Sequence, residues 1–175
     1  MVCILPLFGF EAVYLILRSM NYWLFKSEPS EYSIDDLRQD KVEHWDGTRN
    51  YQVRNMMRDE INKGDKVLFY HSNSGNDTGV VGTATVVQEG YPDFTAEDVQ
   101  SAHPDPKHTA DNPIWYMVDV QFEEKFPRVV TLSEIKDDKR FADMKLVQKG
   151  NRLSVFSISK MHFDAICKIV HETAQ

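Results

Sequence analysis

Residues 22–29 read Tyr-Trp-Leu-Phe-Lys-Ser-Glu-Pro, and we expect the chain to build a pocket around the end of this stretch. The aromatic and apolar first half is typical of a buried strand. Pro29 ends the strand, because it has no amide hydrogen to donate and it pushes the preceding residue towards an extended or turn conformation. Lys26, Ser27 and Glu28 are therefore predicted to lie where a rigid scaffold holds an amine, a hydroxyl and a carboxylate in place.

The bulk composition favours one soluble globular domain. The chain has 175 residues, of which 42% are apolar and 27% charged, and its net charge is −7. A domain that holds a long polyanion mainly by charge usually has a basic excess, so we expect any nucleic-acid role to be local, such as one base in one pocket. Cys3 and Cys167 offer neither a disulfide framework nor a zinc spacing. We therefore expect a reducing, cytoplasmic location. A compact single domain without tails is also more typical of a bacterial protein.

Residues 1–19 differ in composition from the rest, being almost wholly apolar apart from interruptions such as Glu11. The basic start and small-residue cleavage site of a secretory signal are missing, and the apolar run is shorter than the roughly 20 residues that a membrane helix needs. We expect Met20 to be the natural start, with an apolar leader before it and one domain over 20–171. The alternatives are an extra packed strand or hairpin and a weak membrane anchor.

From residue 20 onward, short strands alternate irregularly with short helices. The hydrophobic pattern predicts strands over 67–70, 80–87, 115–122 and 152–156, and helices over 34–39 and 49–61. It also predicts a short helix that opens with a capping box at 131–134 and a final helix capped by Ser159. This mixture indicates an α+β domain with a curled sheet rather than a doubly wound one. Gly82 predicts a bulge or a close backbone approach. The polar, proline-punctuated segment 90–113 has the length of a functional loop.

Trp45 is the strongest single candidate for ligand binding. It lies in a polar stretch beside His44, Asp46 and Gly47, and a tryptophan outside an apolar run is a candidate wall for stacking a planar ligand. The alternative is a tryptophan that covers the edge of the core. Ser27 and Glu28 can face the edge of a base, because a carboxylate accepts a hydrogen bond from an exocyclic amine, as it does with cytosine. Their alternative role is to cap a turn.

Further candidate pocket residues follow other predicted strand ends and turns, and each also has a structural alternative as a helix cap or a polar loop. They are Asn50, Tyr70, His71, Ser72, Tyr91, Pro92, Leu153 and Ser154. Arg49 and Arg54 are weak candidates for phosphate contacts, with a solvated helix face as the alternative. His103, Asp105 and His108 lack a recognised metal-ligand spacing, so we expect no metal and no cofactor. Ser27 as a nucleophile would need His71 as its base, and we do not favour this.

Six stretches resemble motifs of the EVE domain family, in the same order and spacing over about residues 20–170. They are Tyr-Trp-Leu-Phe-Lys-Ser-Glu-Pro at 22–29, Trp-Asp-Gly-Thr-Arg-Asn-Tyr-Gln-Val-Arg-Asn at 45–55, Gly-Asp-Lys-Val-Leu-Phe-Tyr-His-Ser at 64–72, Tyr-Pro-Asp at 91–93, Asp-Pro-Lys at 105–107 and Arg-Leu-Ser-Val at 152–155. The resemblance implies a PUA-like fold, a small curled mixed β-barrel flanked by short helices and related to the YTH and ASCH domains. It also implies binding of modified bases, chiefly modified cytosines in DNA, without known catalysis.

Carried over motif by motif, the resemblance assigns roles to the candidates. Trp45 would form one wall of an aromatic cage, Ser27 and Glu28 would face the base edge, and Asn50 would assist. Residues 70–72 and 153–154 would line the remaining sides, and Tyr91 and Trp115 are candidates for the second aromatic wall.

The function we expect is therefore a non-enzymatic reader of a modified base, with modified cytosine favoured. Its partner would be a modified nucleobase in DNA or RNA, or a free nucleoside, and we expect a monomer without a membrane partner. One alternative is a small hydrolase or nuclease of the ASCH type, in which Lys26 and Glu28 act as general acid and base. Another is a protein-interaction module that uses the same groove, because a fold of this kind does not dictate one function.

Overall fold

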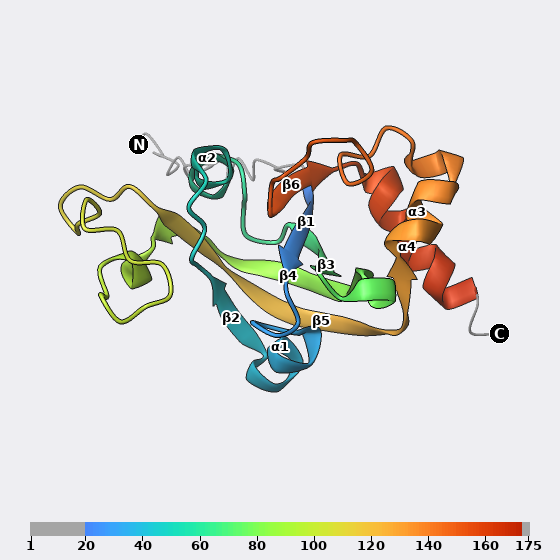
Figure 1. Ribbon diagram of the computed structural model, residues 1–175, viewed down its shortest axis with the longest axis horizontal. Helices are drawn as coiled ribbons and strands as arrows, with labels where there is room; N and C mark the ends of the chain where they lie inside the picture. Colours follow the sequence, from blue (N-terminus) through green and yellow to red (C-terminus); the bar gives the residue numbers. More distant parts are fainter. Residues whose placement is uncertain (1–19, 173–175) are drawn as a thin grey trace, which may run out of the picture.

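The computed structural model describes residues 20–172, and the expectations about residues 1–19 concern a segment outside them (Figure 1). The strands are β1 (Tyr22–Ser27), β2 (Val42–Trp45), β3 (Lys66–His71), β4 (Gly79–Pro92), β5 (Tyr116–Thr131) and β6 (Val155–Ile158). The helices are α1 (Ile34–Asp40), α2 (Tyr51–Asp59), α3 (Leu132–Asp137) and α4 (Lys160–Glu172), with short 3-10 turns η1 (Gly75–Asp77), η2 (Phe94–Ala96) and η3 (Lys139–Phe141). Within this range, no helix has the length and apolar character needed to cross a membrane.

The six strands form one mixed sheet in the order β2-β5-β4-β3-β1-β6. β1 and β3 run parallel, and the other neighbours are antiparallel. The α+β class expected from the sequence is confirmed. The sheet bends but does not close into a barrel, because β2 and β6 remain its two edges.

Alternation along β1 divides the core into two layers. Trp23 and Phe25 face one side of the sheet, where α1 and α2 cover them with residues such as Leu37 and Met57. Leu24 faces the other side, where it packs against the layer formed by α3, η3 and α4. Since successive strand residues point to opposite faces, this short apolar run reaches both cores.

The predicted close approach at Gly82 is confirmed. A Cβ atom at this position would lie 2.2 Å from the carbonyl oxygen of Glu124, so only glycine fits between β4 and β5. The pairing of the two strands shifts register next to Gly82 and at three further points. These irregularities bend the strands, which run well beyond the predicted ranges 80–87 and 115–122.

The parallel pairing of β1 and β3 brings their carboxyl ends together. Ser27 lies opposite His71, and Phe25 lies opposite Phe69. The backbone N–H and the hydroxyl of Ser72 both donate to the carbonyl oxygen of Ser27, at 2.9 and 3.3 Å. The two strand ends thus form one rigid edge, on which the candidate site is built.

Candidate functional site

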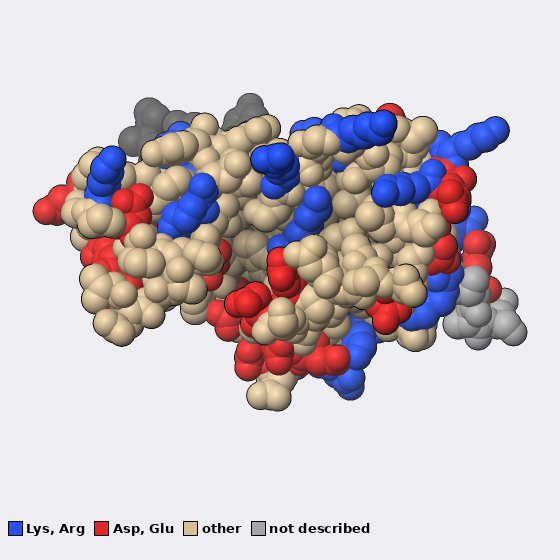
Figure 2. Space-filling view, viewed as in Figure 1, with Lys and Arg blue, Asp and Glu red and all other residues tan. Residues whose placement is uncertain are grey.

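An open cavity of about 710 Å³ lies at this edge, between the ends of β1 and β2 and the loop that follows β4. Figure 2 shows it as a hollow near the centre of the visible face. Among the predicted pocket residues, those that line it are Lys26, Ser27, Glu28, Trp45, Asn50 and Ser154. The other lining residues are Glu31, Tyr32, Glu43, His44, Asp46, Gly47, Thr48, Arg49, Thr95, Ser101, Ala102 and His103.

Trp45 ends β2 and packs on two phenylalanines, Phe25 of β1 and Phe69 of β3. Its ring centroid lies 5.1 Å from that of Phe25 and 5.4 Å from that of Phe69, with an edge-on geometry to Phe69. The side chain is only half-buried, so part of the indole remains available to the cavity. Trp45 therefore combines both roles that the sequence left open: it covers the edge of the core and lines the cavity.

Ser27 and Glu28 lie at the turn after β1, and the turn is fixed from the β3 side. The side-chain amide of Asn73 donates to the Glu28 carboxylate. Asn73 has a φ of +55°, the left-handed region that asparagine tolerates better than most residues. Because Ser72 binds the Ser27 carbonyl and Asn73 binds Glu28, the loop after β3 sets where the carboxylate lies in the cavity.

Lys26 contributes to the cavity, but its amine lies on the other face of the sheet. The ammonium group is 5.1 Å from the ring centroid of Phe156 and 5.9 Å from that of Tyr70. Burial lowers the pKa of this amine. Within the described residues, Lys26 and Glu28 make no hydrogen bond or ion pair with each other; Glu28 follows the end of β1, and its carboxylate accepts from Asn73 instead.

The structure places the other predicted pocket residues outside the cavity lining. Tyr70 is buried in the second core, because one step along β3 from Phe69 points to the opposite face. Tyr91 donates its hydroxyl to Asp119, and Pro92 ends β4 beside it. Leu153 packs against both cores, and Trp115, the other candidate wall, donates its indole N–H to Asp105.

His71 serves as an internal acceptor rather than as a cavity wall. Its Nε2 accepts a hydrogen bond of 3.1 Å from the backbone N–H of Ile34, the first residue of α1. This bond needs a neutral imidazole, and burial lowers the pKa of His71. His71 thereby fixes α1 and the segment before it, including Tyr32, against the end of β3.

The lowered pKa of His71 predicts a pH dependence of stability. The unfolded chain takes up the proton first, so this contribution is complete above the unfolded pKa of about 6.5 and is lost as the pH falls through the folded value. We expect the difference in free energy of unfolding between wild type and His71→Gln to shrink as the pH falls below about 6.5. Urea unfolding between pH 7.5 and pH 5 measures it. A difference that stays constant would contradict this account.

Tyr32, His44 and His103 line the cavity although the sequence did not single them out as pocket residues. Tyr32 donates its hydroxyl to Asp40, which holds the ring at the rim, and desolvation by burial raises the pKa of the phenol. The sequence signal for His44 is its place beside Trp45, which the structure puts at the end of β2. Tyr32 and His103 come from loops, and only the fold brings them to Trp45.

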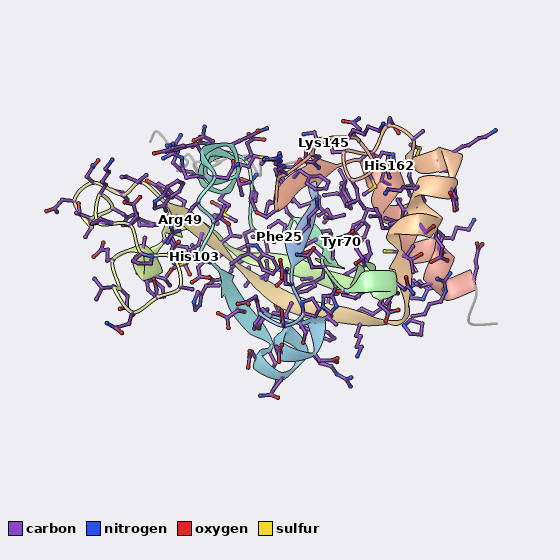
Figure 3. All side chains as sticks on the ribbon, in the orientation of Figure 1. Phe25, Arg49, Tyr70, His103, Lys145 and His162 are labelled. Atoms are coloured by element: carbon purple, nitrogen blue, oxygen red, sulfur yellow. The ribbon has the colours of Figure 1, made fainter. Side chains whose placement is uncertain are left out.

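Arg49 fixes the loop after β4 over one side of the cavity. Its guanidinium donates to the backbone carbonyl of His103 and, at 2.7 Å, to the buried carboxylate of Asp93. Asp93 also accepts from the backbone N–H of Gly47. Gly47 has a φ of +66°, and a Cβ atom there would lie 2.8 Å from the His103 ring. Figure 3 shows Arg49 and His103 side by side.

Both arginines proposed as phosphate contacts are engaged within the protein. The Arg49 guanidinium is used by Asp93 and His103, and it also lies 5.4 Å from the Trp115 ring centroid. Arg54 donates to the carbonyl of Ile114 and to Asn55. Asn50, the third polar candidate of this stretch, accepts from the N–H groups of residues 52 and 53 and caps α2.

The loop residues His108 and Asp105 have structural partners. The Nδ1 atom of His108 accepts from the backbone N–H groups of Ile114 and Trp115, and Asp105 accepts from the indole of Trp115. In the part of the chain that the structure describes, no group of three or more His, Cys, Asp or Glu side chains is placed to hold a metal ion. These residues therefore explain the ordered course of the loop.

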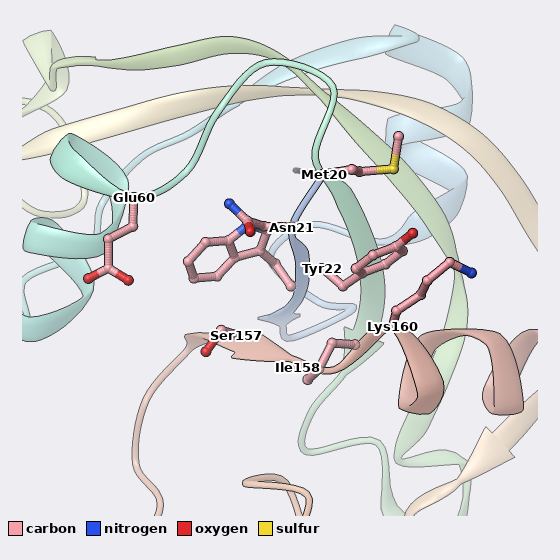
Figure 4. A pocket seen from close by; sticks show the side chains of 8 residues that line it. Met20, Asn21, Tyr22, Glu60, Ser157, Ile158 and Lys160 are labelled. Atoms are coloured by element: carbon pink, nitrogen blue, oxygen red, sulfur yellow. The ribbon is translucent and has the colours of Figure 1, made fainter. Parts of the chain in front are cut away.

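A second cavity of about 540 Å³ lies beside the start of β1 (Figure 4). The ammonium of Lys160 lies 5.8 Å from the ring centroid of Tyr22 and is paired with Asp164. The indole N–H of Trp23 donates to the buried Asp65. Because these polar groups already have partners, this cavity offers fewer recognition groups than the one at Trp45.

Comparison with known proteins identifies close relatives. The family model of the EVE domain matches residues 21–169. Thymocyte nuclear protein 1 of Danio rerio is 38% identical, over 88% of this chain and 74% of that protein. A hypothetical protein from Leishmania major is 44% identical, with a TM-score of 0.85 over 90% of this chain and 98% of its own. The human THYN1 protein, solved in complex with DNA containing 5-methylcytosine, is 34% identical, with a TM-score of 0.78 over 85% of this chain and 96% of its own.

These relatives correct the expected cytoplasmic location. Curated relatives from three vertebrates carry the name thymocyte nuclear protein 1, which points to the nucleus instead. A low cysteine content indicates only a reducing compartment, and the nucleus shares that property with the cytosol. Because the relatives include vertebrate as well as bacterial proteins, they do not show that this chain is bacterial.

Proposed function

The chain belongs to the EVE domain family, and we propose that it binds a modified base, with modified cytosine favoured, in the cavity at Trp45. The observation that carries this proposal is the half-exposed indole of Trp45, rigidly packed on Phe25 and Phe69, beside the carboxylate of Glu28. The human THYN1 protein, a relative of this chain, was solved with DNA that contains 5-methylcytosine. This relation favours DNA as the carrier of the base.

The energetics of such binding are plausible for this cavity. Extruding a base from a duplex costs a few kcal/mol, and stacking on an aromatic side chain returns about 1–3 kcal/mol per base. Hydrogen bonds to the base edge supply the remainder. A methyl group on the base adds about 0.8 kcal/mol when it is buried. Discrimination between cytosine and 5-methylcytosine is thus expected to be modest unless the methyl group fills a tight part of the cavity.

Acidic side chains at the cavity favour a base that carries an exocyclic amine. Glu28, Glu31, Glu43 and Asp46 all line it, and carboxylates are acceptors only. Cytosine and adenine present such an amine, whereas thymine and uracil present carbonyl oxygens that these groups would repel. Tyr32 is our candidate for the second aromatic wall, because it lines the same cavity and the two earlier candidates do not.

The hydrolase alternative is less well supported by the geometry. It needs Lys26 and Glu28 to act as a pair on one substrate. The Lys26 amine lies against Phe156 and Tyr70, on the far face of the sheet from the Trp45 ring. We therefore infer a binding protein without catalysis.

The test is isothermal titration calorimetry of the full chain with single-stranded and duplex oligonucleotides. Each carries one central cytosine, 5-methylcytosine, 5-hydroxymethylcytosine, adenine, N6-methyladenine or thymine. Selective binding of a modified cytosine, with the oligonucleotide recovered intact by mass spectrometry, supports the proposal. Equal affinity for all six bases, or a chemically altered product, overturns it.

Substitution of Glu28 by glutamine is expected to weaken binding of the preferred oligonucleotide about tenfold. The variant keeps the size of the side chain but replaces a charged acceptor by a neutral amide, and hydrogen bonds to charged groups contribute about 1.5–3 kcal/mol. Glu89→Gln serves as the control, because Glu89 is exposed and does not line the cavity. Unchanged affinity in Glu28→Gln would show that this carboxylate does not contact the base.

A further inference from the structure

The segment between η3 and β6 carries three exposed cations, Lys145, Lys149 and Arg152, which we call the basic loop. Within the described residues, none of the three forms an ion pair or a side-chain hydrogen bond. Many other surface cations of this acidic protein do have a carboxylate partner, as in the pairs Lys66–Glu123, Lys125–Asp35, Arg128–Glu134, Arg140–Asp138, Lys160–Asp164 and Lys168–Glu172. Among the described residues, the basic loop thus brings three cations without a carboxylate partner close together in the sequence.

The basic loop is held in a fixed relation to the cavity. The side chain of Asn151 donates to the carbonyl of Lys145 and accepts from the backbone N–H of Leu153. The next residue, Ser154, lines the cavity, and its carbonyl accepts from the backbone N–H of Lys26. A chain of short hydrogen bonds thus leads from the basic loop to the cavity wall.

The charges around the cavity are divided between two sides. In Figure 2, Lys and Arg atoms gather above the hollow, whereas Asp and Glu atoms gather below it. Figure 3, in the same orientation, labels Lys145 on the upper side. Four acidic residues, Glu28, Glu31, Glu43 and Asp46, line the cavity itself. A polyanion at this mouth would be repelled by one side and attracted by the other.

We propose that the basic loop binds the phosphates next to the recognised base, so that the nucleic-acid strand runs along this side of the cavity and avoids the acidic side. This inference rests on the proposed function. It assigns the phosphate contacts to cations that are free, in place of Arg49 and Arg54, which are engaged within the protein. Three phosphate contacts need only a small local cluster of cations, so they are compatible with a net charge of −7 for the whole chain.

The test compares two triple variants of the full chain that lose the same charge. One is Lys145→Ala, Lys149→Ala, Arg152→Ala. The matched control is Lys63→Ala, Lys136→Ala, Arg38→Ala, whose side chains are also exposed but lie on other segments. Affinity for fluorescent 12-nucleotide single strands, with and without a central 5-methylcytosine, is measured by anisotropy between 25 and 200 mM salt. Affinity for the free 5-methylcytosine nucleoside is measured by calorimetry.

We expect the basic-loop variant to bind both strands more weakly, by roughly ten- to a hundredfold at low salt, because each lost phosphate contact reduces the slope of log K against log salt by about 0.7. Nucleoside binding should not change, and the control variant should bind strands as the wild type does. A basic-loop variant that matches the control would overturn the inference, as would a wild type that binds no strand at all.

The two proposals fail in different ways. If the wild type binds both strands equally and does not bind the nucleoside, base recognition fails. Weaker strand binding by the basic-loop variant than by the control variant would still show that the strand runs along the basic loop. If the wild type selects the modified base but both triple variants bind equally well, base recognition stands and the strand follows another route.

Discussion

Replacing Trp45 by alanine is expected to reduce affinity for the preferred oligonucleotide by about five- to 150-fold, because stacking contributes about 1–3 kcal/mol per base. Trp45→Phe retains an aromatic face and should keep most of the affinity. Calorimetry with the 5-methylcytosine strand measures both variants.

The control for this prediction must separate lost stacking from lost folding. Trp45 packs on Phe25 and Phe69, so its truncation will also lower the free energy of unfolding, by up to a few kcal/mol. Urea unfolding gives this cost directly. Tyr91→Ala is the companion variant, because it removes a half-buried aromatic ring that does not line the cavity. If Trp45→Ala stays folded and binds as tightly as Tyr91→Ala, the cavity is not the binding site.

Local sequence signals predicted several of the residues that line the cavity at Trp45. The run at 22–29 marked the strand end because an apolar stretch met Pro29, and those signals depend on residues adjacent in the chain. Trp45 stood out because it lies among polar residues, although the strand that carries it was missed. β2 is a short edge strand whose residues are half-buried or exposed, so it lacks a hydrophobic alternation.

The errors came from side-chain direction and from tertiary contacts. Tyr70 was assigned to the cavity, yet the period of two along β3 puts it opposite Lys26 and into the second core. Counting from Phe69 would have revealed this. No local pattern predicts Tyr32 or His103 as cavity residues. Tyr32 lies in the segment before α1 and His103 in the loop after β4, and only the tertiary fold brings these segments to the cavity. Similarly, no local pattern shows that the Arg49 guanidinium is used by Asp93.

Replacing Asp93 by alanine is expected to be the most destabilising of the substitutions considered. Its fully buried carboxylate accepts hydrogen bonds from Gly47, from Thr95 and from the guanidinium of Arg49. Removing one partner of a buried ion pair costs about 3–5 kcal/mol, because the other charge remains without compensation. We expect a value near the lower end, since the Arg49 side chain is 21% exposed. Urea unfolding at pH 7 measures the loss.

The same contacts predict that Asp93→Ala also weakens binding, because the loop that bears Thr95, Ser101 and His103 loses its anchor.

A double-mutant cycle with Arg49→Met separates the pair from the rest of the loop. The double variant should lose less stability than the sum of the two single variants, because neither charge is then left buried alone. Asp164→Ala, which breaks an exposed pair with Lys160, is the control and should change stability little. Additive losses in the cycle would show that the Arg49–Asp93 contact does not hold the loop.

Acid titration gives an independent check on Asp93. Burial acts to raise the pKa of this carboxyl, but the hydrogen bonds from Thr95 and Arg49 outweigh it and lower the pKa. The stabilisation is therefore complete above the unfolded pKa of about 3.9 and is lost as the pH falls through the lower, folded value. Asp93→Asn keeps the shape of the side chain and cannot titrate, so the stability gap between it and the wild type should narrow only in strong acid. A gap that already narrows between pH 7 and pH 5 would mean that Asp93 is not the ionised acceptor of Arg49.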